Sequence, residues 1–211
     1  MELFLTVLSG IAWTLVYIES IRIGFQHKTY AMPVAALALN IAWETIYGVH
    51  GLTTSLSVQG VVNIIWALTD LLIVYTFFRF GRSELPAFVT GPLFLAWGAL
   101  VFSSAYIVQG MFVVQFDWVA AARYSAFLQN LLMSGLFIAM FVGRRGSRGQ
   151  SLVIAGAKWL GTLAPTILFG VYENAPFILV LGLLCSIFDL AYIGLLLWAR
   201  RQPVALNPLA P

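Results

Sequence analysis

The chain of 211 residues is too apolar to be an ordinary soluble protein. Apolar and aromatic residues make up 61% of the sequence and charged residues only 9%, against about 25% charged residues in a typical soluble domain. A soluble fold of this length buries only about 70% of its chain surface. The composition therefore excludes a soluble enzyme, a disordered segment and a nucleic-acid binder, and the formal net charge of +3 matters only through where the charges lie.

Apolar stretches long enough to cross a bilayer, about 20 residues each, recur along the whole chain. Because backbone polar groups in lipid must be bonded within their own segment, these stretches are predicted to be α-helices. The predicted spans are Leu3–Ser20, Ala31–Val49, Val58–Phe78, Pro86–Val108, Ala120–Val142, Ser151–Tyr172 and Pro176–Ala199. We therefore expect an all-α membrane protein, a seven-transmembrane-helix bundle over residues 1–201, with a short proline-containing cytoplasmic tail at 202–211.

Basic residues gather on one side of the predicted membrane. Nine of the eleven lie on that side, namely Arg22, Lys28, Arg79, Arg82, Arg144, Arg145, Arg148, Arg200 and Arg201. The opposite connections contain only Arg123, and Lys158, a few turns into the sixth span, can extend its ammonium group back to the basic side. The positive-inside rule then places the N-terminus outside and the C-terminus in the cytoplasm.

Four acidic residues lie within the predicted spans, where an ionisable group costs about 2.5–3.5 kcal/mol on insertion scales. Glu19 is explained by an interfacial ion pair with Arg22, one helical turn further on. Glu44 and Asp189 have no basic partner one turn away, and no lysine or arginine is expected at mid-membrane. An unpaired carboxylate in a medium of low dielectric takes up a proton, so both are expected to be acids that can donate one.

The positions of the acids along their helices predict how they are grouped. Asn40, Glu44 and Tyr47 share one helix face at spacings of four and three residues. A rise of about 1.5 Å per residue places Asp70 and Asp189 roughly 18–20 Å from the outer surface and Glu44 roughly 8–10 Å from it. We expect all three carboxyl groups to line one cavity in the outer half of the membrane. A polar contact between helices, worth only about 0.6 kcal/mol per hydrogen bond, is the structural alternative for each.

Aromatic residues make up 15% of the chain, and several lie inside the spans close to the acids. These are Trp13, Tyr17, Trp43, Tyr47, Trp66, Tyr106, Phe169, Phe188 and Tyr192. Aromatic faces stabilise cations without supplying a nucleophile. Proton-donating acids beside such faces favour carbocation chemistry, although ordinary aromatic packing in a membrane core produces the same pattern.

Several other chemistries lack the residues that they need. The sequence has no Asp-rich motif for the Mg²⁺ that ionises a diphosphate, no histidine pair on a helix and no nucleophile motif around serine or cysteine. We therefore expect neither a metal nor a cofactor. A seven-helix small-solute or proton-coupled transporter is the alternative function, because intramembrane acids also serve as proton relays.

The second and last spans carry a pattern found in one enzyme family. The second span reads Asn-x-x-Trp-Glu-x-x-Tyr at Asn40, Trp43, Glu44 and Tyr47, and the last reads Asp-x-x-Tyr at Asp189. With these pieces in this order on seven spans, the chain resembles the integral-membrane terpene cyclases of fungal meroterpenoid and indole-diterpene pathways and their bacterial relatives.

The resemblance implies a metal-independent cyclase that begins by protonating its substrate, an epoxide or an alkene. In that family the acids at the positions of Glu44 and Asp189 are those on which activity depends. No role is carried over to Asp70, because fungal members tend to have a neutral amide there. The implied substrate is a lipophilic farnesyl- or geranylgeranyl-type chain joined to a polar aromatic part, bound by Asn40 and the aromatic residues above. The implied location is the cytoplasmic membrane of a bacterium or the endoplasmic reticulum of a fungus.

Overall fold

The computed structural model describes residues 1–202, which are helical nearly throughout and contain no strand. The α-helices are α1 (Glu2–His27), α2 (Val34–Thr54), α3 (Val58–Phe80), α4 (Gly91–Gln115), α5 (Trp118–Gly143), α6 (Leu152–Pro165) and α7 (Pro176–Arg200). A 3-10 helix, η1 (Gly81–Glu84), follows α3, and a π-helical segment, η2 (Thr166–Tyr172), follows α6. Most of the predicted tail, residues 203–211, lies outside the described residues.

Six helical segments are long and apolar enough to cross a membrane, namely α1, α3 with η1, α4, α5, α6 with η2, and α7. They make the chain a multi-pass membrane protein. The remaining helix, α2, is 21 residues long but is less apolar, because Asn40, Glu44 and His50 lie within it. The structure therefore confirms the all-α membrane class with six such segments.

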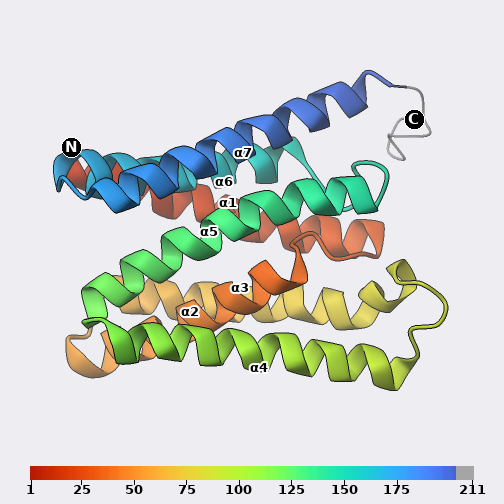
Figure 1. The fold of residues 1–211 in the computed structure, drawn as a ribbon, viewed down its shortest axis with the longest axis horizontal. Helices are drawn as coiled ribbons and strands as arrows, with labels where there is room; N and C mark the ends of the chain where they lie inside the picture. The colour runs from red at the N-terminus through yellow and green to blue at the C-terminus, as the bar shows by residue number, and fades with distance from the viewer. Residues whose placement is uncertain (203–211) are drawn as a thin grey trace.

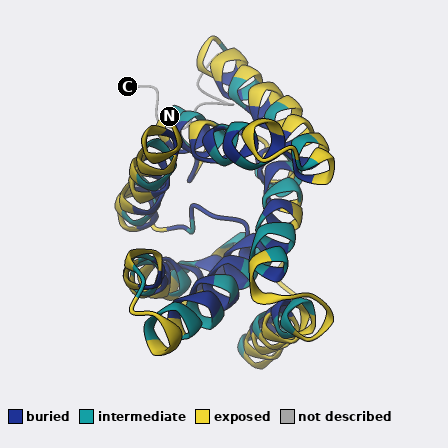
Figure 2. Cartoon of the chain, turned by 90° about the vertical axis from the view of Figure 1, so that its left-hand side faces the viewer, coloured by how far each residue is buried: buried dark blue, intermediate teal, exposed yellow. Residues whose placement is uncertain are grey.

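The helices form a closed ring with one helix outside it. Neighbours in the ring pack as α1–α3, α3–α2, α2–α5, α5–α7, α7–α6 and α6–α1, while α4 packs against α2 and α5. Figure 1 shows α4 and α7 at opposite edges of the bundle. In the end view of Figure 2, buried residues occupy the inner faces of the helices and exposed residues the outer faces. Much of that outer surface is apolar, as lipid contact requires.

Small residues hold α2 close to α3. A Cβ atom on Gly48 would lie 2.9 Å from Cδ1 of Ile64, and one on Gly60 would lie 2.9 Å from the carbonyl carbon of Gly51. Small residues at helix interfaces allow backbones to approach in this way. The close approach lets polar side chains of α2 and α3 reach one another inside the ring.

Two of the helix boundaries that differ from the prediction have a local cause. The sequence predicts one helix over Ser151–Tyr172, whereas the α-helical part ends at Pro165 and η2 continues it. Proline has no N–H to donate and its ring crowds the preceding turn, and π-helical turns accommodate such breaks. The fourth helix begins at Gly91 instead of Pro86, because the Thr90 hydroxyl caps it by accepting a hydrogen bond from the Leu93 N–H at 3.4 Å.

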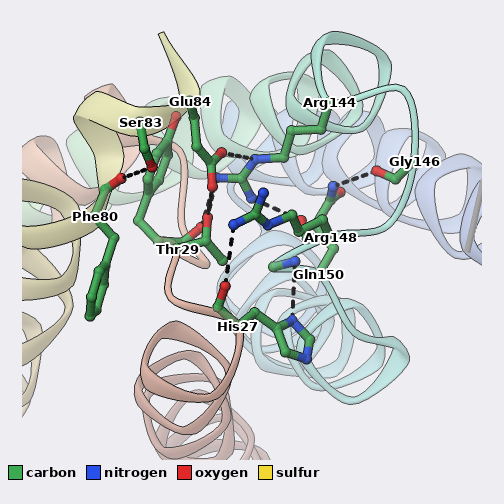
Figure 3. A network of polar contacts seen from close by, with 11 residues as sticks. His27, Thr29, Phe80, Ser83, Glu84, Arg144, Gly146, Arg148 and Gln150 are labelled. Carbon is green, nitrogen blue, oxygen red and sulfur yellow. Dashed lines mark hydrogen bonds and ion pairs between the residues drawn. The ribbon is translucent and has the colours of Figure 1, made fainter. Parts of the chain in front are cut away.

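Arg144 holds the connections together at the end of the bundle where α1, α3 and α5 finish (Figure 3). Its Nε lies 2.7 Å from Oε2 of Glu84, and both side chains are only about a tenth exposed, at 9% and 10%. The guanidinium group also donates to the Thr29 hydroxyl at 3.1 Å and to the Tyr30 carbonyl at 2.9 Å. Gly149 adopts a φ of 70°, and a Cβ there would lie 2.6 Å from Nη1 of Arg144. These contacts of Arg144, here called the Arg144 clamp, fix the ends of α1, α3 and α5. They therefore fix the register of the three helices inside the ring.

Candidate active site

Glu44 lies in a buried hydrogen-bond network between α1 and α2. Its exposed fraction is only 1%. Its Oε1 accepts hydrogen bonds from the hydroxyl of Tyr17 and, at 2.9 Å, from Nδ2 of Asn40 one turn earlier on α2. Its Oε2 has no hydrogen-bond partner within residues 1–202. One oxygen of Glu44 is thus held in place by two hydrogen bonds, while the other has none from the described residues.

Asn40 joins Glu44 to Asp70 on α3. Nδ2 of Asn40 lies 3.0 Å from Oδ2 of Asp70 and 2.8 Å from the hydroxyl oxygen of Tyr17. Asp70 is fully buried, and its Oδ1 has no partner in the described part of the chain. Two carboxyl groups this close in a buried site repel each other when both are charged. A proton on one of the two relieves that repulsion, so the arrangement suits an acid that can donate a proton.

Two glutamines fix the orientation of Asn40 from the other side. Nε2 of Gln129, on α5, donates to Oδ1 of Asn40 at 3.4 Å, and Nε2 of Gln109, on α4, donates to Oε1 of Gln129 at 2.7 Å. With its oxygen turned to Gln129, Asn40 presents its NH₂ group to the two carboxyl groups. Neither glutamine was among the predicted site residues. Both could have been found as uncharged polar residues inside apolar spans.

Asp189 is not an unpaired acid, which corrects the sequence-based prediction. Nζ of Lys158, on α6, lies 2.8 and 2.9 Å from the two carboxylate oxygens of Asp189 and 2.7 Å from the hydroxyl oxygen of Ser134. The side chain of Lys158 is 0% exposed and that of Asp189 is 1% exposed. The prediction that Lys158 extends back to the basic side is therefore wrong, as is the prediction of no basic residue at mid-membrane. The ammonium group stays inside because Asp189 and Ser134 satisfy its hydrogen bonds there.

The three acids form two groups instead of one. Within residues 1–202 no hydrogen bond or ion pair joins the Glu44–Asp70 group to the Asp189–Lys158 group. One apolar core cluster includes Tyr17, the neighbour of Glu44, together with Tyr192 of α7. The arrangement provides a hydrogen-bonded carboxyl group pair and a separate ion pair within one bundle.

The predicted difference in depth between Glu44 and Asp70 is wrong. The sequence predicts that the second span ends at Val49, whereas α2 continues to Thr54. Five additional residues at about 1.5 Å each move Glu44 roughly 7.5 Å deeper, which removes most of the predicted difference from Asp70 on the adjacent helix.

Aromatic side chains lie beside each group. The ring centroid of Tyr17 is 5.8 Å from that of Trp66 and 6.4 Å from that of Trp13. On α7, the Tyr192 hydroxyl donates to Oε1 of Gln150 at 2.8 Å, and its ring lies 5.3 Å from that of Phe137. The Tyr17 ring thus lies beside the Glu44 group, and Tyr192 lies one turn after Asp189 on α7.

Trp43 and Tyr47 form a further aromatic pair on α2, with ring centroids 5.1 Å apart. Nε1 of Trp43 donates to the Ala122 carbonyl at 3.0 Å, which ties α2 to α5. The hydroxyl of Tyr47 is buried and has no partner among the described residues. Like Oε2 of Glu44, it is a polar atom without a hydrogen bond inside the bundle.

Three predicted aromatic residues are not brought to either group of acids. Tyr106 and Phe188 lie on the outer surface, 41% and 40% exposed. Phe188 precedes Asp189 and so points to a different side of α7. The ring centroid of Phe169 lies 4.2 Å from Cζ of Arg123, whose guanidinium group stacks over the ring. The expectation that these three line a cavity with the acids is not met.

Comparison with known proteins places the chain in a family. The sequence profile of the Pyr4-like transmembrane terpene cyclases matches residues 1–202. The chain belongs to this family. It is 28% identical over 204 residues to the terpene cyclase pyr4 of Aspergillus fumigatus, covering 92% of this chain and 84% of the relative. It is 29% identical over 167 residues to the Pyr4-family terpene cyclase mfmH of Annulohypoxylon moriforme, covering 78% and 68%. No solved structure matches it.

The Pyr4-like family membership confirms the resemblance seen in the second and last spans. It supports a role as a membrane terpene cyclase in terpenoid secondary metabolism.

A hollow of about 350 Å³ lies between α1 and α3 of this Pyr4-like protein, beside the Glu44 group. Its lining residues are Val7, Gly10, Ile11, Thr14, Leu15, Val62 and Trp66. The prediction was a single cavity lined by all three acids. The structure instead has two separate polar groups, and the hollow lies beside the Glu44 group only.

Proposed function

We propose that this protein cyclises a lipophilic prenylated molecule inside the membrane by protonating its terminal alkene or epoxide. The observation that carries the proposal is the network in which Asn40 holds the carboxyl groups of Glu44 and Asp70, both buried. Membership of a terpene cyclase family supports cyclisation as the outcome of the protonation. The reaction proceeds by acid catalysis and needs no metal.

Glu44 is the proposed proton donor. Tyr17 and Asn40 both donate hydrogen bonds to Oε1 of Glu44, so Oε2 is the atom on which a proton would be carried. Asp70 lies across Asn40 from it and favours the protonated form of Glu44 by repulsion between like charges. A buried carboxylic acid of this kind is suited to general acid catalysis.

The bond changes balance without a further reactant. The O–H bond of Glu44 breaks, and the proton adds to the epoxide oxygen, whose C–O bond opens, or to the terminal alkene carbon. Each neighbouring double bond then supplies the electron pair for one new ring bond, and the positive charge moves along the chain past aromatic faces. A carbon next to the last cation finally loses a proton. One proton is given and one is taken, so substrate and product are isomers.

Asp189 has a different proposed role. Its carboxylate is already paired with Lys158 and therefore has no proton to donate. A fixed negative charge at this depth attracts the cation and can accept the proton released at the end of the cascade. Lys158 and Ser134 are positioning residues, because they hold the carboxylate in one orientation.

The proposed topology has all seven α-helices crossing the membrane, with the N-terminus outside and the C-terminus in the cytoplasm. Support comes from the positive-inside rule, because Arg22, Arg79 and Arg200 each lie within the last two turns of an odd-numbered helix. Packing of α2 between α3 and α5 in the ring supports a crossing by α2 as well.

The experiment is conversion of a substrate panel by the protein in detergent, without a gradient. The panel contains phenols and indoles with farnesyl or geranylgeranyl chains, each with and without a terminal epoxide. The account predicts cyclic products with the mass of the substrate from at least one class. Products of a different mass, or solute uptake by proteoliposomes without any conversion, would contradict it.

A further inference from the structure

The hollow between α1 and α3, here called the α1–α3 groove, opens on the outer surface of the bundle. Val7, Ile11 and Leu15 on its α1 side are 48%, 58% and 46% exposed. None of its lining residues is charged. Its volume of about 350 Å³ lies within the usual range of small-molecule pockets, roughly 300–1,000 Å³. A groove of this character suits a hydrocarbon chain arriving from the bilayer.

One hydrogen bond joins the α1 wall of the groove to its α3 wall. Nε1 of Trp66 donates to the hydroxyl of Thr14 at 3.2 Å, and the Thr14 hydroxyl donates to the Gly10 carbonyl at 2.8 Å. These are the polar side chains among the lining residues. Their contact satisfies both groups in an apolar wall and can be broken at modest cost, about 0.5–1.5 kcal/mol.

Trp66 connects the groove to the candidate acid. One side of its indole lines the groove, and its ring lies 5.8 Å from the ring of Tyr17. The hydroxyl of Tyr17 in turn donates to Oε1 of Glu44. The side chains of Trp66 and Tyr17 thus connect the groove to Glu44.

We propose that the α1–α3 groove binds the prenyl chain of the substrate and leads its reactive end past Thr14 and Trp66 toward Glu44. The occupant is a linear isoprenoid chain, because the lining is apolar and the groove adjoins an acid that acts on a terminal alkene or epoxide. This inference rests on the proposed function. Beyond that function, we assign the prenyl chain to a binding site on the lipid-facing side of the bundle, between α1 and α3.

Glycine at position 10 keeps the groove open. A Cβ atom on Gly10 would meet no heavy atom within 4 Å, so a larger side chain there would project into the hollow without displacing neighbours. Gly110, on α4 outside the ring, is equally open. Gly10→Phe and Gly110→Phe therefore form a matched pair that adds the same side chain inside and outside the groove.

The first test measures kcat/KM of both variants for the prenylated substrate, at equal amounts of folded protein. Filling the groove is expected to lower kcat/KM of Gly10→Phe by at least about tenfold, the scale of steric discrimination in apolar pockets. Gly110→Phe is expected to stay within about twofold of the wild type, as for a surface substitution. Equal values for the two variants would overturn the proposal.

The second test locates the chain without requiring turnover. A farnesyl phenol with a photoreactive diazirine on the middle isoprene unit of the chain is irradiated with the Glu44→Gln variant in membranes, and the labelled peptides are identified. Labelling of residues 7–15 and 62–66 that unlabelled farnesyl phenol suppresses is the expected result. Labelling elsewhere, or labelling that only phospholipid suppresses, would overturn the groove assignment. If the wild-type protein cyclises no substrate but the groove is labelled specifically, the groove assignment stands and only the proposed function is refuted.

Discussion

Lys158 and Asp189 form an ion pair inside the bundle, with Nζ of the lysine 2.8 Å from Oδ1 of the aspartate and neither side chain more than 1% exposed. Removing two charges from water costs several kcal/mol per ion, and mutual attraction repays this only when the remaining hydrogen bonds are satisfied. Ser134 satisfies one of them at 2.7 Å. The pair therefore distinguishes Asp189, a fixed carboxylate, from Glu44, whose partners are Tyr17 and an amide.

Lys158→Met tests whether the ion pair supports both the fold and the chemistry. The change leaves an unpaired buried carboxylate at Asp189, which typically costs about 3–5 kcal/mol of stability. We expect a lower melting temperature in detergent and a loss of cyclisation. In the double variant Lys158→Met/Asp189→Leu no charge remains, so stability should recover while activity stays lost. Activity in the double variant would remove Asp189 from the mechanism.

Asp70→Asn tests the contribution of the second carboxyl group in the Glu44 group. Asparagine has nearly the same shape and can still accept the hydrogen bond from Asn40 through its oxygen, so the protein should fold. Without a second carboxyl group to repel its negative charge, Glu44 is protonated in a smaller fraction of molecules. We therefore expect the rate of cyclisation at neutral pH to fall by about tenfold or more and to recover at lower pH, where Glu44 is protonated again. A rate that is unchanged, or lowered equally at every pH, would show that Asp70 does not keep the proton on Glu44.

Tyr17→Phe removes one hydrogen bond to Oε1 of Glu44 and keeps the ring beside Trp66. A hydrogen bond to a charged group contributes about 1.5–3 kcal/mol, and about 1.4 kcal/mol corresponds to tenfold in rate. We expect kcat to fall by about tenfold to a hundredfold, because the bond stabilises Glu44 after its proton has left, while KM changes little. A rise in KM with unchanged kcat would instead place Tyr17 in substrate binding.

Gly149→Ala tests the clamp around Arg144. The φ of 70° at Gly149 disfavours an L side chain, and a Cβ there would lie 2.6 Å from Nη1 of Arg144. We expect a loss of stability of about 1–3 kcal/mol, measured as a lower melting temperature. The surviving folded protein should keep its kcat, since the clamp lies at the end of the bundle. An unchanged melting temperature would contradict the role given to Gly149.

Contacts within one helix were predictable from the sequence. The spacing of Asn40 and Glu44 predicts a shared face, and the two side chains are hydrogen-bonded at 2.9 Å. The spacing of Glu19 and Arg22 predicts an ion pair, which the structure confirms at 2.7 Å. Both follow from the 3.6-residue period of an α-helix, which needs no knowledge of the neighbouring helices.

Contacts between helices were not predictable in the same way. Lys158 and Asp189 are 31 positions apart on different helices, so no spacing rule connects them. The bond from Asn40 to Asp70 depends on where α2 ends, and that end lies five residues beyond the predicted one. Polar pairs of this kind are set by the rotation and depth of each helix in the ring, which arise from packing and not from local sequence.

The rate of product formation by Glu44→Gln in membranes shows whether Glu44 donates the initiating proton. Glutamine keeps the shape of Glu44 but has no acidic proton, and Glu2→Gln at the exposed start of α1 serves as the matched control. At equal amounts of folded protein, the account predicts at least about a hundredfold less cyclised product from Glu44→Gln and an unchanged rate from Glu2→Gln. Cyclisation by Glu44→Gln at the wild-type rate would contradict it.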